Sequence, residues 1–398
     1  MNNPRLFLVV AATSLACAVS AQGPRQPVRS RRAATSASRL TDSLRVTLRK
    51  AQNDGAFPGA IAVVGTRSSI TATVSVGQLD AAIPVAPNLR TLYDLASLTK
   101  IIGTTTMMLQ LVDQQRVALD TPVVHYLTEW RGPGVATVTI RQLLTHSSGL
   151  AAWRAFYKEA VDRTDARAQL LLVGPEARPG TRYLYSDMNF MLLGMVIEQV
   201  TGMPLDSAFQ SMVARPLKLA ETRFRPDSGD WARTAPTEYD PWRQRKLRGE
   251  VHDENAFRFD GVSGHAGLFS SAQDLSRVAR MWLNGGTLDG VRIASAETVA
   301  LFTRVQDSLI SKRALGWETP NGSNSAGRRF AGSAFGHTGF TGTSIWIDPS
   351  RSLFLILLTN RVNPTRENRK IGAVRVALAD AVAGAVDGMA VRPSAASP

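Results

Sequence analysis

Residues 94–100 read DLASLTK and run directly into the apolar stretch IIGTTTMMLQL at 101–111. The apolar character of residues 98–115 predicts a buried helix of the core. Ser97 and Lys100 are three residues apart, a spacing that places two side chains on one face of a helix. Ser97 would sit at the start of this helix, where free N–H groups favour a developing negative charge. The pair is therefore a candidate nucleophile and base; the alternative is a helix cap beside a solvated lysine.

Segments typical of β-strands lie on both sides of a mainly helical middle. Residues 59–78 predict two strands with a polar turn, and residues 343–360 predict a hairpin that turns at DPSR. An amphipathic helix is expected at 39–54 and a terminal helix at 370–386. We therefore expect an α/β (α+β) fold: an antiparallel sheet built from both termini and flanked by helices, with an inserted helical lobe at about 98–285.

The first 21 residues have the pattern of a secretory signal peptide, with one early arginine, a short apolar run and small residues before Gln22. Cys17, the only cysteine, lies in this segment, and SLAC resembles a lipoprotein box only in part. We favour cleavage after Ala21 over anchoring through Cys17, which leaves a mature chain without disulfides or thiolate metal sites. The protein is expected to be exported to the periplasm or the extracellular space, without a transmembrane segment after cleavage.

Composition at the ends of the chain predicts where the folded part begins and ends. Residues 22–38 are rich in Arg, Ser and Pro and predict a disordered linker, and residues 387–398 predict a disordered tail. The folded domain itself is expected at 39–386. The formal net charge is +14, but no stretch interleaves basic and aromatic residues, so we expect no nucleic-acid partner. The oligomeric state stays open.

A second candidate motif is YSDMNF at 185–190, just before an apolar helix that Gly202 would end. Tyr185 and Asp187 are two residues apart and can point the same way in an extended turn. The alternative is a core tyrosine followed by an aspartate that caps the helix.

A third candidate motif is FGHTGFTGTSIWI at 335–347, where His337, Thr338 and Gly339 lead into a predicted strand. A glycine lets the backbone approach a ligand closely, and the N–H group beside it can help to form an oxyanion hole. The alternative is a glycine-rich turn with an incidental histidine.

In this order the three motifs resemble the Ser-x-x-Lys, Tyr-x-Asn and Lys-Thr-Gly motifs of class C β-lactamases and related penicillin-binding proteins. The resemblance covers about residues 40–385 and is closest to the subgroup sometimes fused to bacterial β-N-acetylhexosaminidases. It implies a β-lactamase/transpeptidase-like fold and a serine hydrolase that works without metal or cofactor. Supporting stretches are LLTHSSGL (143–150), PGTRYLYSD (179–187), VHDENA (251–256) and GHAGLFSSAQDLSR (264–277).

The resemblance also implies a role for each motif residue. Ser97 would be the acylated nucleophile, and Lys100 and Tyr185 would share the general-base and proton-shuttle work. The backbone N–H groups of Ser97 and Phe340 would form the oxyanion hole. The substrate would contact Asp187, His337, Thr338 and Gly339.

Two of these positions depart from the family pattern. Asp187 replaces an asparagine; an ionised aspartate offers only acceptors and can hold Lys100 in its charged form. His337 replaces a lysine, and a histidine is mostly neutral at pH 7. We therefore expect weak turnover of anionic β-lactams at most, and better turnover of esters or uncharged amides.

Other enzyme classes lack support. The chain contains no G-x-S-x-G elbow, Walker loop or G-x-G-x-x-G motif. No H-E-x-x-H pair occurs, which argues against metal catalysis.

The substrate is expected to be a small molecule or peptide, with cell-wall peptides among the candidates. A non-catalytic wall-binding or sensor protein on the same fold is the alternative. The five histidines are His125, His146, His252, His265 and His337.

Overall fold

The structure of the protein is a computed structural model that describes residue 1 and residues 28–390, with side chains from residue 38 to residue 388. The predicted signal peptide with Cys17 lies outside the described residues, apart from Met1. The same is true of residues 391–398 of the predicted tail.

A five-stranded antiparallel sheet forms the centre of the fold, in the order β10-β11-β12-β1-β2. Its two halves come from opposite ends of the chain and meet where Ala60 of β1 pairs with Thr359 of β12. Both predicted hairpins are present, which confirms the expected antiparallel sheet built from both termini. The strands are β1 (Gly59–Thr66), β2 (Ile70–Gly77), β10 (Phe335–Thr338), β11 (Ser344–Asp348) and β12 (Leu353–Thr359).

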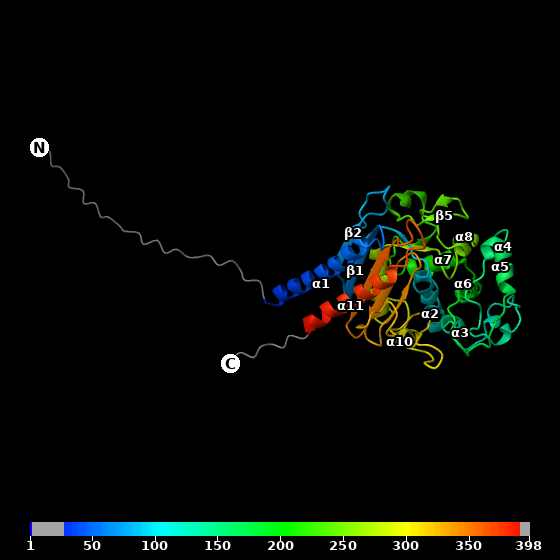
Figure 1. The fold of residues 1–398 in the computed structure, drawn as a ribbon. Coiled ribbons are helices and arrows are strands. Elements are labelled where there is room, and N and C mark those ends of the chain that lie inside the picture. The colour runs from blue at the N-terminus through cyan, green and yellow to red at the C-terminus, as the bar shows by residue number, and fades with distance from the viewer. Residues whose placement is uncertain (2–27, 391–398) are drawn as a thin grey trace.

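Helices cover both faces of this sheet. Helices α1 (Val28–Asn53) and α11 (Ile371–Ala390) lie side by side on one face, drawn blue and red in Figure 1. Leu44 and Leu48 of α1 pack there with Leu378 of α11 and the alanines and valines of the sheet. Helix α9 (Ala272–Leu283) covers the opposite face, where Ile61 and Val63 join the larger core. Side chains alternate along β1, so Ile61 and Val63 pack into the core under α9, and their neighbours pack into the core under α1 and α11.

The ends of the folded part differ from the prediction. Helix α1 begins at Val28, so the second half of the predicted linker at 22–38 is helical. Helix α11 continues to Ala390, four residues past the predicted end of the domain at 386. Arginine and alanine are good helix formers and extend α1 toward the N-terminus, and glycine alone does not stop α11. The low-complexity composition of these stretches was a poor guide to where the helices begin and end.

Most remaining elements are helical. The predicted stop of α6 is confirmed, since Gly202 adopts a left-handed φ of 69° after the last turn. The helices are α2 (Thr106–Asp113), α3 (Ile140–Leu144), α4 (Phe156–Glu159), α5 (Arg163–Leu171), α6 (Asp187–Thr201), α7 (Leu205–Phe209), α8 (Glu254–Arg258) and α10 (Ala296–Thr303), with short 3-10 or π turns η1 (Lys100–Thr105), η2 (Val123–His125), η3 (Val135–Thr137), η4 (Gln210–Ala214) and η5 (Ser228–Arg233). The short strands are β3 (Tyr93–Asp94), β4 (Arg223–Phe224), β5 (Tyr239–Asp240), β6 (Arg245–Lys246), β7 (Leu268–Ser270), β8 (Thr287–Leu288) and β9 (Val291–Arg292).

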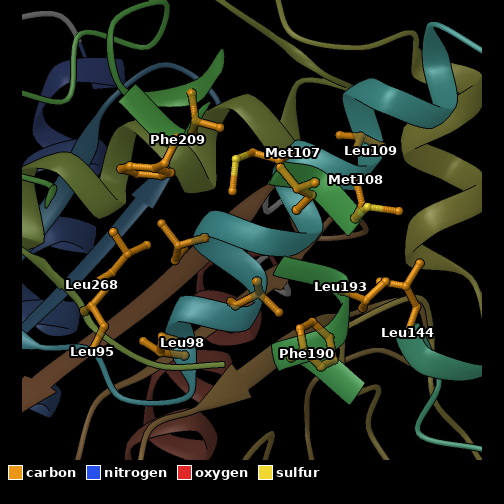
Figure 2. Close-up of a cluster of buried hydrophobic side chains, with 14 of the residues drawn as sticks. Leu95, Leu98, Met107, Met108, Leu109, Leu144, Phe190, Leu193, Phe209 and Leu268 are labelled. Carbon is orange, nitrogen blue, oxygen red and sulfur yellow. The ribbon is translucent and has the colours of Figure 1, made fainter. Parts of the chain in front are cut away.

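The predicted buried helix after DLASLTK is present, but it has two parts. Lys100 begins the π-helix η1, and α2 continues from Thr106. Figure 2 shows Leu98 and Met107 of this segment among buried side chains that come from distant parts of the chain. A π turn is rare and is often found at functional sites. Among the described residues, no helix is long and apolar enough to cross a membrane.

Candidate active site

Ser97 lies in a tight turn between β3 and η1. The preceding residue, Ala96, has a φ of 46°, a left-handed conformation that costs free energy for a residue with a Cβ. The Asp94 carboxylate fixes this turn by accepting a 2.8 Å hydrogen bond from the Ala96 N–H group. The chain then enters the helix, where the Lys100 N–H group donates to the Ser97 carbonyl at 3.0 Å. This places Ser97 and Lys100 on one face, as the spacing predicts.

The Lys100 ammonium is fully buried and lies among several oxygen atoms. Its Nζ lies 3.1 Å from Ser97 Oγ, 3.0 Å from the His265 carbonyl oxygen and 2.8 Å from Asp187 Oδ1. Burial by itself lowers the pKa of Lys100, but the neighbouring Asp187 carboxylate and Tyr185 outweigh it, and the net shift is upward. Lys100 in this state is therefore a charged donor rather than a free base.

Tyr185 completes the group around the nucleophile. Its hydroxyl is hydrogen-bonded to both Lys100 and Ser97, and burial raises the pKa of this phenol, so it is neutral. The ring lies against the His146 ring, with 4.4 Å between the centroids. His146 Nδ1 accepts hydrogen bonds from the Ser186 N–H group at 3.1 Å and from Asn189 Nδ2 at 3.2 Å. His146, which we did not predict as a site residue, thus holds the Tyr185 segment in place.

The turn after β10 forms the opposite wall of the site. A Cβ on Gly339 would lie 2.4 Å from the Leu95 carbonyl oxygen and 2.1 Å from Thr343 Oγ1, so only glycine allows this close approach. Thr341 and Thr343 donate side-chain hydrogen bonds to the carbonyls of Asp94 and Leu95, at 2.7 and 3.1 Å. The turn is therefore tied to the segment that carries Ser97.

Two backbone N–H groups are free at this junction. Within the part of the chain that the structure describes, neither Ser97 N nor Phe340 N donates a hydrogen bond. An oxyanion hole requires N–H donors that are available to a developing negative charge, and both groups meet this requirement. That role stays a prediction for both residues, as do the substrate contacts of Thr338 and Gly339.

His337 is a neutral acceptor in this site. Its Nδ1 donates to the Thr338 carbonyl oxygen at 2.8 Å, and Nε2 has no hydrogen-bond partner among the described residues. Burial, together with the nearby Arg313 guanidinium, holds the pKa of His337 well below its usual range. The family's lysine position therefore supplies no positive charge here. It offers a lone pair to a substrate N–H or O–H group instead.

Arg313 is a cation that no motif in the sequence indicates, because it lies in a loop. It is 7% exposed, and its Cζ lies 5.7 Å from the centroid of the Tyr185 ring. Its Nη1 donates to Tyr183 Oη at 3.2 Å and forms a salt bridge of 3.8 Å with Glu318 Oε1, a contact longer than a hydrogen bond. The guanidinium borders a cavity of about 350 Å³ that Tyr183 and Tyr185 also line. A fixed positive charge is thus present next to Tyr185.

The VHDENA and GHAG stretches also reach this centre. His265 Nε2 lies 3.0 Å from Asp253 Oδ1, and its Nδ1 lies 2.8 Å from Ser263 Oγ. Ligand atoms of Asp187, Asp253 and His265 lie within 4.8 Å of one another, close enough together to hold a metal ion. Both ring nitrogens of His265 already have partners, however, and the Lys100 ammonium already contacts Asp187. The lysine therefore supplies the positive charge that these carboxylates require.

A serine flanked by a buried lysine and tyrosine, with two free N–H groups beside it, is the equipment of a serine hydrolase that forms an acyl-enzyme. The chain belongs to the β-lactamase family, whose model, described as Beta-lactamase, matches residues 44–379.

Relatives and solved structures agree with this assignment. The chain is 32% identical over 343 residues to the N-acetylmuramyl-L-alanine amidase of Bacillus subtilis (strain 168), a match that covers 77% of each chain. It is 33% identical over 311 residues to the putative D-alanyl-D-alanine carboxypeptidase of Escherichia coli (strain K12), covering 70% of this chain and 71% of the relative. EstCE1, a hydrolase with promiscuous acyltransferase activity, superposes with a TM-score of 0.71 at 21% identity, covering 88% of this chain and all of that one. The last likeness shows the fold alone.

Proposed function

We propose that the protein is an exported serine hydrolase that cleaves amide or ester bonds of cell-wall-derived peptides through an acyl-enzyme on Ser97. The observation that carries the proposal is the buried contact of 3.1 Å between Ser97 Oγ and Lys100 Nζ, with Tyr185 bonded to both. The names of the amidase and carboxypeptidase relatives support peptides of the cell wall as substrates. The signal-peptide pattern at 1–21 supports export.

Acylation needs a proton acceptor, because Lys100 is charged and Tyr185 is neutral in the free protein. The Ser97 proton passes to Lys100 as Lys100 hands a proton to the Asp187 carboxylate 2.8 Å away. The Ser97 and Phe340 N–H groups hold the carbonyl oxygen as its charge develops. The leaving amine then takes the Tyr185 proton, which Lys100 and the protonated Asp187 replace. Water attacks the acyl-enzyme by the same route, and every group returns to its starting state.

Arg313 supports a substrate that carries a carboxylate. A charge-assisted hydrogen bond contributes about 1.5 to 3 kcal/mol, which corresponds to roughly 10- to 150-fold in affinity. Arg313→Gln is therefore expected to raise KM for a peptide with a free C-terminal carboxylate by at least about tenfold. The C-terminally amidated peptide should be much less affected, and the exposed Arg304→Gln should change neither. An equal loss on both peptides would remove Arg313 from substrate binding.

The catalytic proposal is tested with the mature protein and Ser97→Ala, using p-nitrophenyl acetate and butyrate as substrates. Wild type is expected to exceed the variant by at least about 10²-fold, and mass spectrometry should detect an acyl group on Ser97. Equal, slow rates would contradict the acyl-enzyme. An adduct that forms and never hydrolyses would favour the non-catalytic sensor instead.

A further inference from the structure

Arg375 of helix α11 contacts the turn that carries Phe340. Its Nη2 atom donates to the Gly339 carbonyl oxygen at 2.7 Å and to the Thr343 carbonyl oxygen at 2.8 Å. The Gly339 N–H group closes the same turn by donating to the Thr343 carbonyl at 2.7 Å. One guanidinium nitrogen, from the helix drawn red in Figure 1, therefore bridges the two ends of the turn between β10 and β11.

The peptide unit between Gly339 and Phe340 determines where the Phe340 N–H group points. This peptide bond is trans, so its C=O and N–H groups point in opposite directions. Because Arg375 holds the carbonyl oxygen, the N–H group is directed away from the guanidinium. The Gly342 N–H group also donates to the Gly339 carbonyl, at 3.1 Å, but that bond lies within the turn and moves with it. Arg375 instead joins this peptide unit to a separate helix.

Arg375 has no acidic partner that would explain its position. In the part of the chain that the structure describes, its Nε atom is buried without a hydrogen-bond partner, and no carboxylate forms a salt bridge with it. Burial and the nearby Arg361 guanidinium lower the pKa of Arg375 to about 10, so the side chain stays charged at neutral pH. A buried cation is costly unless polar groups compensate it. The carbonyl oxygens of Gly339 and Thr343 provide this compensation.

A second arginine holds the next peptide unit of the turn. Arg361 is buried, and its Nε donates to the Phe340 carbonyl oxygen at 2.8 Å. Its Nη1 donates to the carbonyls of Arg366 and Asn368, both at 2.7 Å, which fixes this side chain to the loop after β12. Both peptide units that flank the Phe340 Cα atom are thus held by arginines. The unit that contains the Phe340 N–H group is the one that Arg375 holds.

We propose that Arg375 is a positioning residue that directs the Phe340 N–H group at the oxyanion formed when Ser97 attacks its substrate. The inference rests on the proposed function and adds to it a residue outside the three motifs. Arg375 acts through the Gly339 peptide unit and touches no substrate. The alternative is that Arg375 only stabilises the fold. A misdirected N–H group weakens oxyanion binding in every molecule, whereas a folding defect reduces the fraction of active molecules.

The test compares wild type with Arg375→Ala, using p-nitrophenyl butyrate as substrate and phenylboronic acid as inhibitor. Ser97 Oγ adds to the boron atom, the serine proton is released, and a boronate oxygen takes the place of the oxyanion. Arg375→Ala is expected to lower kcat and to raise the Ki of phenylboronic acid, each by at least about tenfold. KM should change much less, because the substrate carbonyl carries little charge before the attack.

Arg328→Ala is the matched control. Arg328 and Arg375 line the same cavity of about 550 Å³, but the Arg328 guanidinium contacts Asp380 and not the turn. This control should keep the kcat and Ki of wild type. Because the cavity borders the Arg375 side chain, added guanidinium ions should restore part of the lost kcat in Arg375→Ala and leave the kcat of wild type unchanged.

The inhibitor constant separates positioning from folding. A lower kcat with an unchanged Ki would indicate a loss of active molecules and would overturn the positioning role, as would a folded Arg375→Ala protein with the kcat and Ki of wild type. If Arg375→Ala does not fold, Arg375→Lys takes its place, since it keeps a cation but lacks the planar guanidinium. The same rise in Ki, on a smaller scale, is then expected, and an unchanged Ki contradicts the proposal.

Failure of the proposed function gives a different result. Wild type would then be no faster than Ser97→Ala, and phenylboronic acid would bind neither protein. That outcome would overturn the proposed function and the role of Arg375 together. An active wild type that phenylboronic acid inhibits, with an Arg375→Ala variant of unchanged Ki, would overturn the role of Arg375 alone.

Discussion

At the scale of single residues, the proposed activation of Ser97 depends on Asp187. An asparagine at this position would remove the carboxylate that contacts Lys100, and burial would then weigh more heavily in lowering the pKa of the lysine. The carboxylate reverses this balance and keeps Lys100 charged. Because the charged lysine cannot accept a proton, the proposed mechanism uses the carboxylate as the final acceptor. Asp187, where the family pattern has an asparagine, therefore fits the charged state of Lys100 in the proposed mechanism.

Asp187→Asn should expose this dependence. Without the carboxylate the pKa of Lys100 falls, so the lysine becomes a neutral base only as the pH rises. We expect kcat/KM for p-nitrophenyl butyrate to fall at least about tenfold at pH 7 and to recover toward pH 10, whereas wild type shows no such rise. The measurement is a pH–rate profile from pH 5 to 10. Asp227→Asn, with an exposed carboxylate, should follow wild type, and an unchanged profile in Asp187→Asn would exclude the relay.

At the scale of elements, the turn between β10 and β11 carries Phe340 of the proposed oxyanion hole and is held against the Ser97 segment by close backbone approach and by the Thr341 and Thr343 side chains. Gly339→Ala places a methyl group against the Leu95 carbonyl and Thr343, so the turn must move away from Ser97. Loss of one oxyanion donor typically costs about 10²- to 10³-fold in kcat, and we expect a loss in this range. The matched control is Gly332→Ala, because a Cβ at Gly332 meets nothing within 4 Å. Equal kcat in both variants would contradict a role for the Phe340 N–H group.

The same scale shows which parts of the molecule the sequence can predict. The hairpins at 59–78 and 343–360 and the apolar helix could be predicted, because their patterns repeat locally over many residues. The π turn at Lys100 could not, since nothing local distinguishes it from an α-helix. Arg313, His146 and the Asp253–His265 pair also escaped prediction. His146, Asp253 and His265 lie in stretches that support the family resemblance, but the sequence alone does not show which residues they contact, and Arg313 lies in no motif.

At the scale of the whole molecule, the two terminal helices close the sheet from outside. Leu378 of α11 is 1% exposed in the core that α1 shares. Leu378→Ala is expected to lower the free energy of unfolding by about 2 to 5 kcal/mol, because it removes buried apolar atoms and leaves a cavity. Denaturant unfolding measures this change. Leu309→Ala, at a side chain that is 96% exposed, should change stability by less than about 0.5 kcal/mol. A similar small effect at Leu378 would contradict the packing of α11.

The pairing of β1 with β12 also has a consequence for the order of assembly during synthesis. Ser97 and Lys100 emerge early, but β12 and the Phe340 turn come from the last part of the chain. A growing chain therefore carries the proposed nucleophile long before it has the proposed oxyanion hole, and closing the sheet requires contacts of high sequence separation. The incomplete chain is expected to have no hydrolase activity. Hydrolysis would begin only once the C-terminal strands have joined the N-terminal ones.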